Sequence, residues 1–160
     1  SLSKTYAMTG WRCGWALGPT SLIKAANAVQ SHSTSNTCSI TQQAAVSALT
    51  ASQECVNAML SEYRVRRDTL MEWFQNQSMF RIVRPDGAFY LFPDISEALS
   101  IDGPRTSLEF ADRLLSEAHV AVTAGEAFDA PGFLRLSFAT SMERLEEGFG
   151  RLSRFVESLK

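Results

Sequence analysis

The stretch SLSKTYAMTGWRCGWALGP, residues 1–19, places a serine, a lysine, a glycine and an arginine close together, ahead of an apolar run. A lysine adds to a carbonyl only as the free amine, and the fork of an arginine binds phosphate through two hydrogen bonds. A serine hydroxyl can donate a further bond to the same phosphate. If the backbone turns back at Gly10, Ser1 and Arg12 would anchor a phosphate while Lys4 reaches a carbonyl.

A phosphorylated aldehyde meets both requirements of this segment, and pyridoxal 5'-phosphate is the common cofactor of that kind. On spacing alone, the same residues also fit a solvated lysine and arginine on the surface. The physical reading therefore yields two alternatives, a cofactor site and a plain polar loop.

Composition and charge limit the classes of function. The chain has 160 residues, 45% of them hydrophobic, which is enough for one ordinary domain with a core. Its 15 Lys and Arg and 17 Asp and Glu give a formal charge of -2, so we expect no nucleic-acid partner and a small polar substrate instead. No apolar run approaches the roughly 20 residues of a membrane helix, and residues 1–10 lack the apolar segment of a signal peptide. We expect no membrane partner.

The cysteines and histidines follow no metal-ligand spacing, so we expect no metal site. Cys13, Cys38 and Cys55 are odd in number and lack a disulfide-framework pattern, which predicts free thiols in the reducing cytoplasm. His32 and His119 have no partner at ligand spacing, and we expect structural roles for both. Because no initiator methionine precedes the dense first motif, we also expect this chain to be a piece of a longer protein.

Helices and short strands alternate along the chain, which indicates an α/β class. The run 11–17 reads as a buried strand closed by a turn, and a helix follows from about Thr20. Further helices are expected over 107–118 and 141–159. Four pairs match the capping-box pattern at a helix start, the second of them ahead of a long helix. They are Ser39 with Gln42, Thr50 with Gln53, Thr106 with Glu109, and Thr140 with Glu143.

Strands are expected over 80–83, 88–92 and 133–138, with a short apolar run at 119–122. The first two are separated by a turn in which Gly87 supplies conformational freedom. This pattern predicts a small α+β domain with one remnant strand and helix of a neighbouring sheet.

Residues 1–19 resemble the cofactor-lysine motif of the fold type I pyridoxal-phosphate-dependent aminotransferases, the aspartate aminotransferase family of classes I and II. That pattern runs Ser, two residues, Lys, then Thr-Gly-Trp-Arg, a spacer and Gly. The matching positions are Ser1, Lys4, Thr9, Gly10, Trp11, Arg12 and Gly14. The resemblance extends over the whole chain in the expected order of elements.

The resemblance implies a role for each polar residue of the motif. Lys4 would form the Schiff base with pyridoxal 5'-phosphate and would then, as a base, move the proton from the substrate's alpha carbon to the cofactor. Ser1 and Arg12 would bind the cofactor phosphate. The groups that contact the pyridine ring would lie before Ser1.

A second motif, GFLRLSFAT at 132–140, places Arg135 inside an apolar strand. A buried guanidinium is costly unless it is paired, so Arg135 must meet a protein carboxylate, reach solvent or bind an anionic ligand. The family has an Arg-Leu-Ser pattern here, and the resemblance implies that Arg135 binds the alpha-carboxylate of the substrate. Such a contact would hold the reacting carbon over the cofactor.

PDGAFYLFP, residues 85–93, also resembles a family segment that turns toward the substrate side chain. Phe89 would then line the substrate pocket, although an aromatic residue in a strand is more often part of the core. In VTAGEAFDAPG, residues 122–132, Ala124-Gly125 stands where the family commonly has Pro-Gly, a departure that would shift a loop beside the site.

The chain is thus expected to be the C-terminal portion of an aminotransferase acting on an amino acid and a 2-oxo acid. Residues 1–50 would end the large cofactor-binding domain, and residues 51–160 would form a connecting helix and the small domain. The parent would be a homodimer, and the isolated chain would be inactive. Two alternatives stay open: another enzyme on this fold, such as a carbon-sulfur lyase, and the aminotransferase-like effector domain of a transcription regulator.

Overall fold

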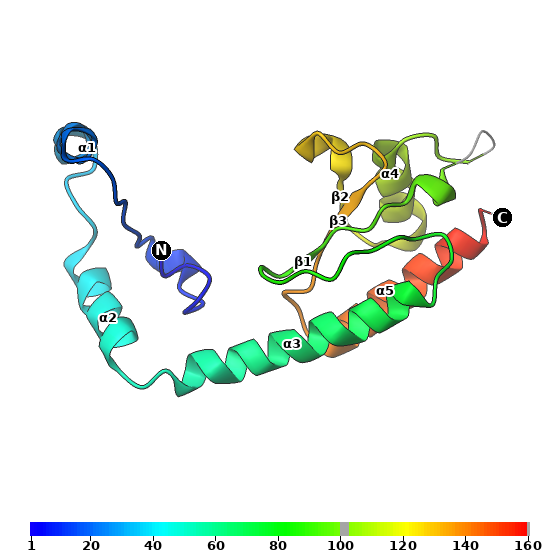
Figure 1. Cartoon of the computed structure of the whole chain (residues 1–160), viewed down its shortest axis with the longest axis horizontal. Helices are drawn as coiled ribbons and strands as arrows, with labels where there is room; N and C mark the ends of the chain where they lie inside the picture. Colours follow the sequence, from blue (N-terminus) through cyan, green and yellow to red (C-terminus); the bar gives the residue numbers. More distant parts are fainter. Residues whose placement is uncertain (100–102, 160) are drawn as a thin grey trace. The chain divides into compact units, whose positions relative to one another are not determined.

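The computed structural model describes residues 1–99 and 103–159, and it divides into two compact units. These are Ser1–Leu60 and Ser61–Lys160. Figure 1 follows the elements of each unit along the chain. No helix of the described residues is long and apolar enough to cross a membrane.

The first unit is helical and has almost no interior of its own. Its elements are η1 (Thr9–Trp11), α1 (Thr20–Ser33), α2 (Ser39–Thr50) and the start of α3 (Glu54–Gln75). Among its described residues only Leu2 and Thr41 are buried. The helix expected from Thr20 is confirmed, and it ends at Ser33.

The strand expected over 11–17 is wrong. Beyond η1 this segment has no regular structure, and Trp15 and Leu17 are 57% and 91% exposed. A strand exists only where another strand satisfies its backbone N-H and C=O groups, and no described segment pairs with residues 11–17.

The second unit is built on a small antiparallel sheet in the order β1-β3-β2. Its strands are β1 (Tyr90–Leu91), β2 (Thr123–Ala124) and β3 (Leu134–Ser137). Tyr90 pairs with Ser137 on one side of β3, and Thr123 pairs with Arg135 on the other. The strands expected at 88–92 and 133–138 are therefore confirmed in their centres.

Helices cover this sheet and enclose one apolar core. They are η2 (Ser96–Ala98), α4 (Ser107–Ala118), η3 (Gly125–Phe128), α5 (Met142–Glu157) and the C-terminal half of α3. In Figure 1, α5 runs alongside the end of α3, and Phe149 of α5 contacts Trp73 and Phe74 of α3 with ring centroids 5.1 and 5.3 Å apart. Phe74, Phe110 and Leu134 are completely buried. The helix predicted over 107–118 is confirmed to the residue.

Two details of the predicted strand region need correction. The strand expected over 80–83 is reduced to a single bridge between Arg81 and Asp94. The left-handed backbone of the following turn belongs to Ala88, with φ 62°, and not to Gly87. The apolar run at 119–122, for which no strand was predicted, leads directly into β2 at Thr123.

Of the four predicted capping boxes, one forms as expected. The Thr106 hydroxyl accepts a 3.1 Å hydrogen bond from the Glu109 N-H at the start of α4. The cap of α5 is Ser141 in place of Thr140. Ser39 and Thr50 lie inside α2 and make no cap, because the helix begins at Ser39 and ends at Thr50.

Candidate active site

The N-terminal segment folds back on itself, as its proposed chemistry requires. The Leu2 N-H donates to the Cys13 carbonyl at 3.3 Å, which brings the two ends of the segment together. A Cβ atom added to Gly14 would lie 3.0 Å from the Cβ of Ser1, so only glycine leaves this approach undisturbed. Ser1 therefore lies beside the backbone that follows Arg12.

Arg12 adopts a left-handed backbone, with φ 52° and ψ 49°. This conformation costs a residue with a side chain about 1 kcal/mol, and such outliers cluster at functional sites. Its Nη1 donates to the Thr9 carbonyl at 3.0 Å, while the Thr9 hydroxyl donates to the Ser3 carbonyl at 3.0 Å. These bonds hold the turn, and most of the N-H donors of the Arg12 guanidinium remain for a ligand.

The charge around this segment favours an anion. Residues 1–53 contain Lys4, Arg12 and Lys24 but no Asp or Glu, so all 17 acidic residues follow in the rest of the chain. None of the ion pairs among described residues includes Arg12. Because residues 1–53 contain no carboxylate side chain, none of them can compete with a phosphate for the Arg12 guanidinium.

The donor set fits pyridoxal 5'-phosphate. A phosphate needs hydroxyl and guanidinium donors, which Ser1 and Arg12 supply, and an aldehyde needs an amine, which exposed Lys4 supplies. The structure establishes the local fold of these three residues and the charge of their segment. Their roles toward the cofactor stay predictions.

Arg135 lies on β3 in the second unit and is half buried. Its guanidinium carbon is 4.6 Å from the ring centroid of Tyr90 and 4.5 Å from that of Phe128. Nη2 makes a long 3.5 Å contact with the Thr123 hydroxyl, and no described carboxylate forms an ion pair with Arg135. Of the alternatives from the sequence, pairing with a carboxylate of the described residues is excluded.

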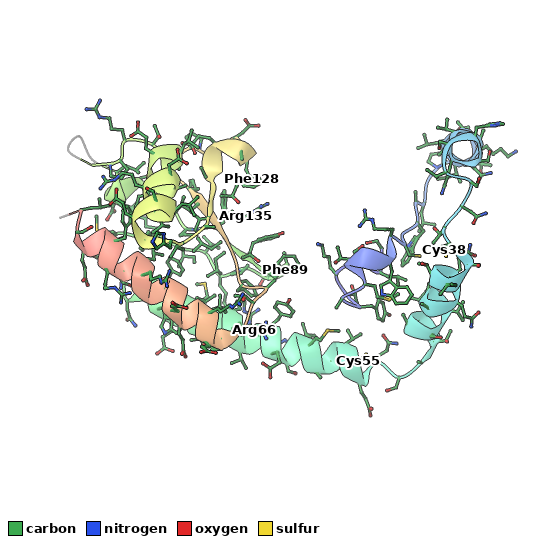
Figure 2. The ribbon with its side chains drawn as sticks, turned by 180° about the vertical axis from the view of Figure 1, so that it is seen from behind. Cys38, Cys55, Arg66, Phe89, Phe128 and Arg135 are labelled. Carbon is green, nitrogen blue, oxygen red and sulfur yellow. The ribbon has the colours of Figure 1, made fainter. Side chains whose placement is uncertain are left out.

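Phe89 belongs to an aromatic cluster that packs against the core of the second unit. Its ring centroid lies 4.5 Å from that of Tyr90 and 6.3 Å from that of Tyr63. The Arg66 guanidinium stacks 5.3 Å from the Tyr63 centroid, and its buried Nε has no hydrogen-bond partner among the described residues. Figure 2 shows Phe89, Arg66 and Arg135 with their side chains. The contact of Phe89 with a substrate stays a prediction.

Sequence reasoning missed Tyr90 and Phe128, the two rings beside Arg135. Phe128 is seven residues before Arg135, and Tyr90 reaches it from a different strand. The sequence held one sign of such neighbours, which is the apolar strand around Arg135. A guanidinium in an apolar strand loses contact with water and needs a polar or aromatic neighbour in its place. Which rings provide it depends on strand pairing.

A scan of family models finds one match, to the model described as aminotransferase class I and II, over residues 1–152. Among curated proteins, the aspartate aminotransferase of Geobacillus stearothermophilus is 45% identical over 157 residues, which cover 98% of this chain and 40% of the relative. The asparagine-oxo-acid transaminase of Streptococcus mutans is 39% identical over 156 residues, again with 98% and 40% coverage.

Solved structures agree with these relatives. The aspartate aminotransferase from Rhizobium meliloti matches with a TM-score of 0.92 and 38% identity, over 98% of this chain and 40% of that one. The aromatic aminotransferase from Pyrococcus horikoshii matches with a TM-score of 0.90 and 35% identity, over 98% and 41%. The chain thus spans about two fifths of the length of the relatives that it matches.

Proposed function

The chain belongs to the aminotransferase class I and II family, and from this premise we propose that its protein transfers an amino group between an amino acid and a 2-oxo acid. Its fold is that of the fold type I aminotransferases, a family that depends on pyridoxal phosphate. The chain spans only about two fifths of the relatives that it matches, so the activity of the complete protein is proposed here. The proposal is argued from the residues of this chain.

The observation that carries the proposal is the environment of Arg135. A guanidinium beside two aromatic rings, with no carboxylate partner among the described residues, is a group ready to bind an anion. Amino acids and 2-oxo acids share one anionic group, the carboxylate next to the reacting carbon. Binding that carboxylate through two parallel hydrogen bonds would orient either substrate in the same way.

Pyridoxal phosphate, when bound, supplies an aldehyde that condenses with amines and a ring that accepts electrons from the substrate carbon. Ser1 and Arg12 would hold its phosphate through hydroxyl and guanidinium donors. Lys4 would present its amine to the aldehyde and later carry a proton at Nζ from the alpha carbon. Phe89 would border the substrate side chain.

The finer parts of the proposal concern the complete protein. We place this chain in its C-terminal portion, with residues 1–50 ending the cofactor-binding domain and 51–160 forming the small domain. We expect a homodimer in the cytoplasm, where a reducing environment agrees with the free thiols of Cys13, Cys38 and Cys55. The names of the relatives make L-aspartate and L-asparagine the first amino donors to test.

A substitution at Arg135 tests the proposal in the complete protein loaded with pyridoxal phosphate. Arg135→Gln removes a charge-assisted pair of hydrogen bonds and should raise the KM for L-aspartate about 10- to 100-fold, with 2-oxoglutarate as acceptor. Arg105→Gln is the matched control, since Arg105 lies in the loop before α4, and its KM should not change. If the wild-type protein instead forms pyruvate, ammonia and a thiol from an S-alkyl-L-cysteine, and no new amino acid, it is a carbon-sulfur lyase.

The cofactor residues have a test that needs no turnover. The 160-residue chain is mixed with pyridoxal phosphate, reduced with borohydride and digested, and the added mass is located by peptide mass spectrometry. We expect modification at Lys4 in preference to Lys24 and Lys160, and a loss of this preference in Arg12→Ala. Equal labelling of the three lysines would contradict a cofactor pocket formed by residues 1–19 alone.

A further inference from the structure

The guanidinium of Arg135 is held by aromatic rings more than by hydrogen bonds. Its carbon lies 4.6 Å from the Tyr90 centroid and 4.5 Å from the Phe128 centroid, both within the range of a cation-π contact. The Thr123 hydroxyl, at 3.5 Å, is a weak acceptor. Figure 2 shows Phe128 and Arg135 next to each other.

Rings and carboxylates use different parts of a guanidinium. An aromatic face attracts the positive charge through its quadrupole but offers no acceptor for the N-H groups. The five N-H donors lie in the plane of the guanidinium, and they are what a carboxylate binds. A ring neighbour can therefore orient Arg135 and displace water while leaving its hydrogen-bonding edge available.

Phe128 does not contribute to the hydrophobic core of the second unit. It is 42% exposed and does not belong to the buried cluster or to the apolar side chains packed against that cluster. An aromatic side chain that stays so exposed loses much of the free energy that burial would provide. Its ring contacts are with Arg135 and, edge to face at 6.0 Å, with Phe92.

The loop that carries Phe128 is closely fixed. The Gly125 N-H donates to the Phe133 carbonyl at 2.8 Å, and the Ala130 N-H donates to the Gly125 carbonyl at 3.0 Å. A Cβ at Gly125 would overlap the Ala130 carbonyl oxygen, so the closed loop requires glycine. The Glu126 carboxylate also accepts a 3.1 Å bond from the Ser107 N-H at the start of α4.

The ring of Phe92 also packs against Phe128. Phe92 stacks on Phe133 with centroids 5.2 Å apart and planes at 13°, and it meets Phe128 edge to face. This places the Phe128 ring between a fixed loop and a fixed aromatic pair. The ring is therefore held where it can restrict the many rotamers of an arginine side chain, which cost about 2 kcal/mol to order.

We propose that Phe128 is a positioning residue for Arg135, whose ring holds the guanidinium with its N-H edge turned toward the carboxylate of the amino-acid substrate. The inference rests on the role proposed above for Arg135 and adds to it a specific neighbour that tunes substrate affinity. Phe128 acts on the carboxylate through Arg135, so its removal affects substrate binding more than the chemical step.

The test uses the complete protein loaded with pyridoxal phosphate and L-aspartate as the probe. Phe128→Leu keeps the apolar volume and removes the ring, and the KM should rise about tenfold while kcat stays within about threefold. Phe128→Tyr retains the ring and should restore the wild-type KM. Phe92→Leu is the matched control, because Phe92 contacts Phe128 without contacting Arg135, and its KM should change less than that of Phe128→Leu.

A double variant makes the route through Arg135 explicit. In the Arg135→Gln background, Phe128→Leu should have no further effect on KM, since the group that it positions is absent. An unchanged KM in Phe128→Leu, or an equal effect in both backgrounds, would overturn the inference. If Arg135→Gln itself leaves KM unchanged, the proposed function of Arg135 fails instead, so the two failures are distinguishable.

Discussion

The two units of this chain differ in how they bury apolar side chains. In Ser61–Lys160, helices α4 and α5 and the end of α3 enclose a core with the sheet. In Ser1–Leu60, Leu2 is the one buried apolar side chain among the described residues. Helices α1 and α2 expose large apolar side chains along their length. These are Leu22 and Val29 of α1, and Ile40, Val46 and Leu49 of α2.

The difference shows that the two candidate binding groups rest on different kinds of support. Arg135 is placed by strand pairing and a closed core, so its environment is a property of its own unit. Lys4 and Arg12 are placed by a short turn with backbone hydrogen bonds, in a unit whose helices do not bury their apolar faces. Exposed faces of this extent are typical of surfaces that other polypeptide covers.

Truncation of a core side chain should have the largest effect. Phe74 is completely buried and meets the rings of Phe80 and Phe149 at 5.3 Å, so Phe74→Ala should destabilise the chain by about 3–5 kcal/mol. Leu22→Ala, at a 62% exposed position of α1, should change stability by less than about 0.5 kcal/mol. Urea denaturation followed by circular dichroism measures both. Similar losses would mean that the first unit has a core after all.

Two glycines of the second unit should respond in opposite directions. Gly125→Ala forces a methyl group against the Ala130 carbonyl and should cost about 1–3 kcal/mol. Gly148 lies in the interior of α5 with no atom within 4 Å of an added Cβ, so Gly148→Ala should stabilise the helix by about 1 kcal/mol. Thermal unfolding gives both values, and a loss of stability in Gly148→Ala would show packing that the helix geometry does not predict.

Acid should act mainly on the second unit, because Glu54 is the single acidic residue of Ser1–Leu60. Hydrogen bonds from Ser96 lower the pKa of the Asp94 carboxyl, which accepts from the Ser96 N-H at 2.8 Å. A pKa lowered in the folded state contributes stability above the unfolded value of about 3.9, and this stability is lost as pH falls through the folded value. Asp94→Asn should therefore weaken the protein at pH 7 and flatten its loss of stability below about pH 4.

The matched control for this pH experiment is Asp112→Asn on α4. The Asp112 carboxylate makes no hydrogen bond or ion pair with the described residues, so its replacement should change the stability at pH 7 by less than about 0.5 kcal/mol. Denaturation midpoints between pH 2 and 7 compare the two variants. A pH dependence that Asp94→Asn leaves intact would contradict the role of the Ser96 contacts.

The smallest effect concerns two thiols of the first unit, which Figure 2 labels at the starts of α2 and α3. The backbone N-H groups of Thr41 and then Ile40, in the first turn of α2, lower the pKa of the Cys38 thiol. Iodoacetamide at pH 7 should therefore modify Cys38 severalfold faster than exposed Cys55, as read by peptide mass spectrometry. The ratio should shrink at pH 9, where ordinary thiols are also ionised. If the ratio of the Cys38 rate to the Cys55 rate did not depend on pH, the faster reaction of Cys38 would come from better access of the reagent and not from the ionisation of its thiol.

Local rules explain which predictions succeeded. The Thr106 cap and the limits of α4 follow from groups within a few residues of each other, and the structure matches them. The strand at 11–17 failed because strand formation depends on a partner that the segment does not specify. The turn before β1 also failed in detail, since Ala88 takes the left-handed backbone that Gly87 was expected to take.

The sequence by itself indicated the family, through the resemblance of residues 1–19 to the cofactor-lysine motif, and it identified Arg135 as a charge in an apolar strand. Such a motif can be recognised in a sequence because its residues lie close together along the chain and because the chemistry of a lysine or a guanidinium belongs to the residue itself. The tertiary structure alone decided that Tyr90 and Phe128 lie beside Arg135, and that Gly125 closes the loop that carries Phe128. Those neighbours come from strand pairing and loop closure between distant residues, which the order of residues along the chain does not express.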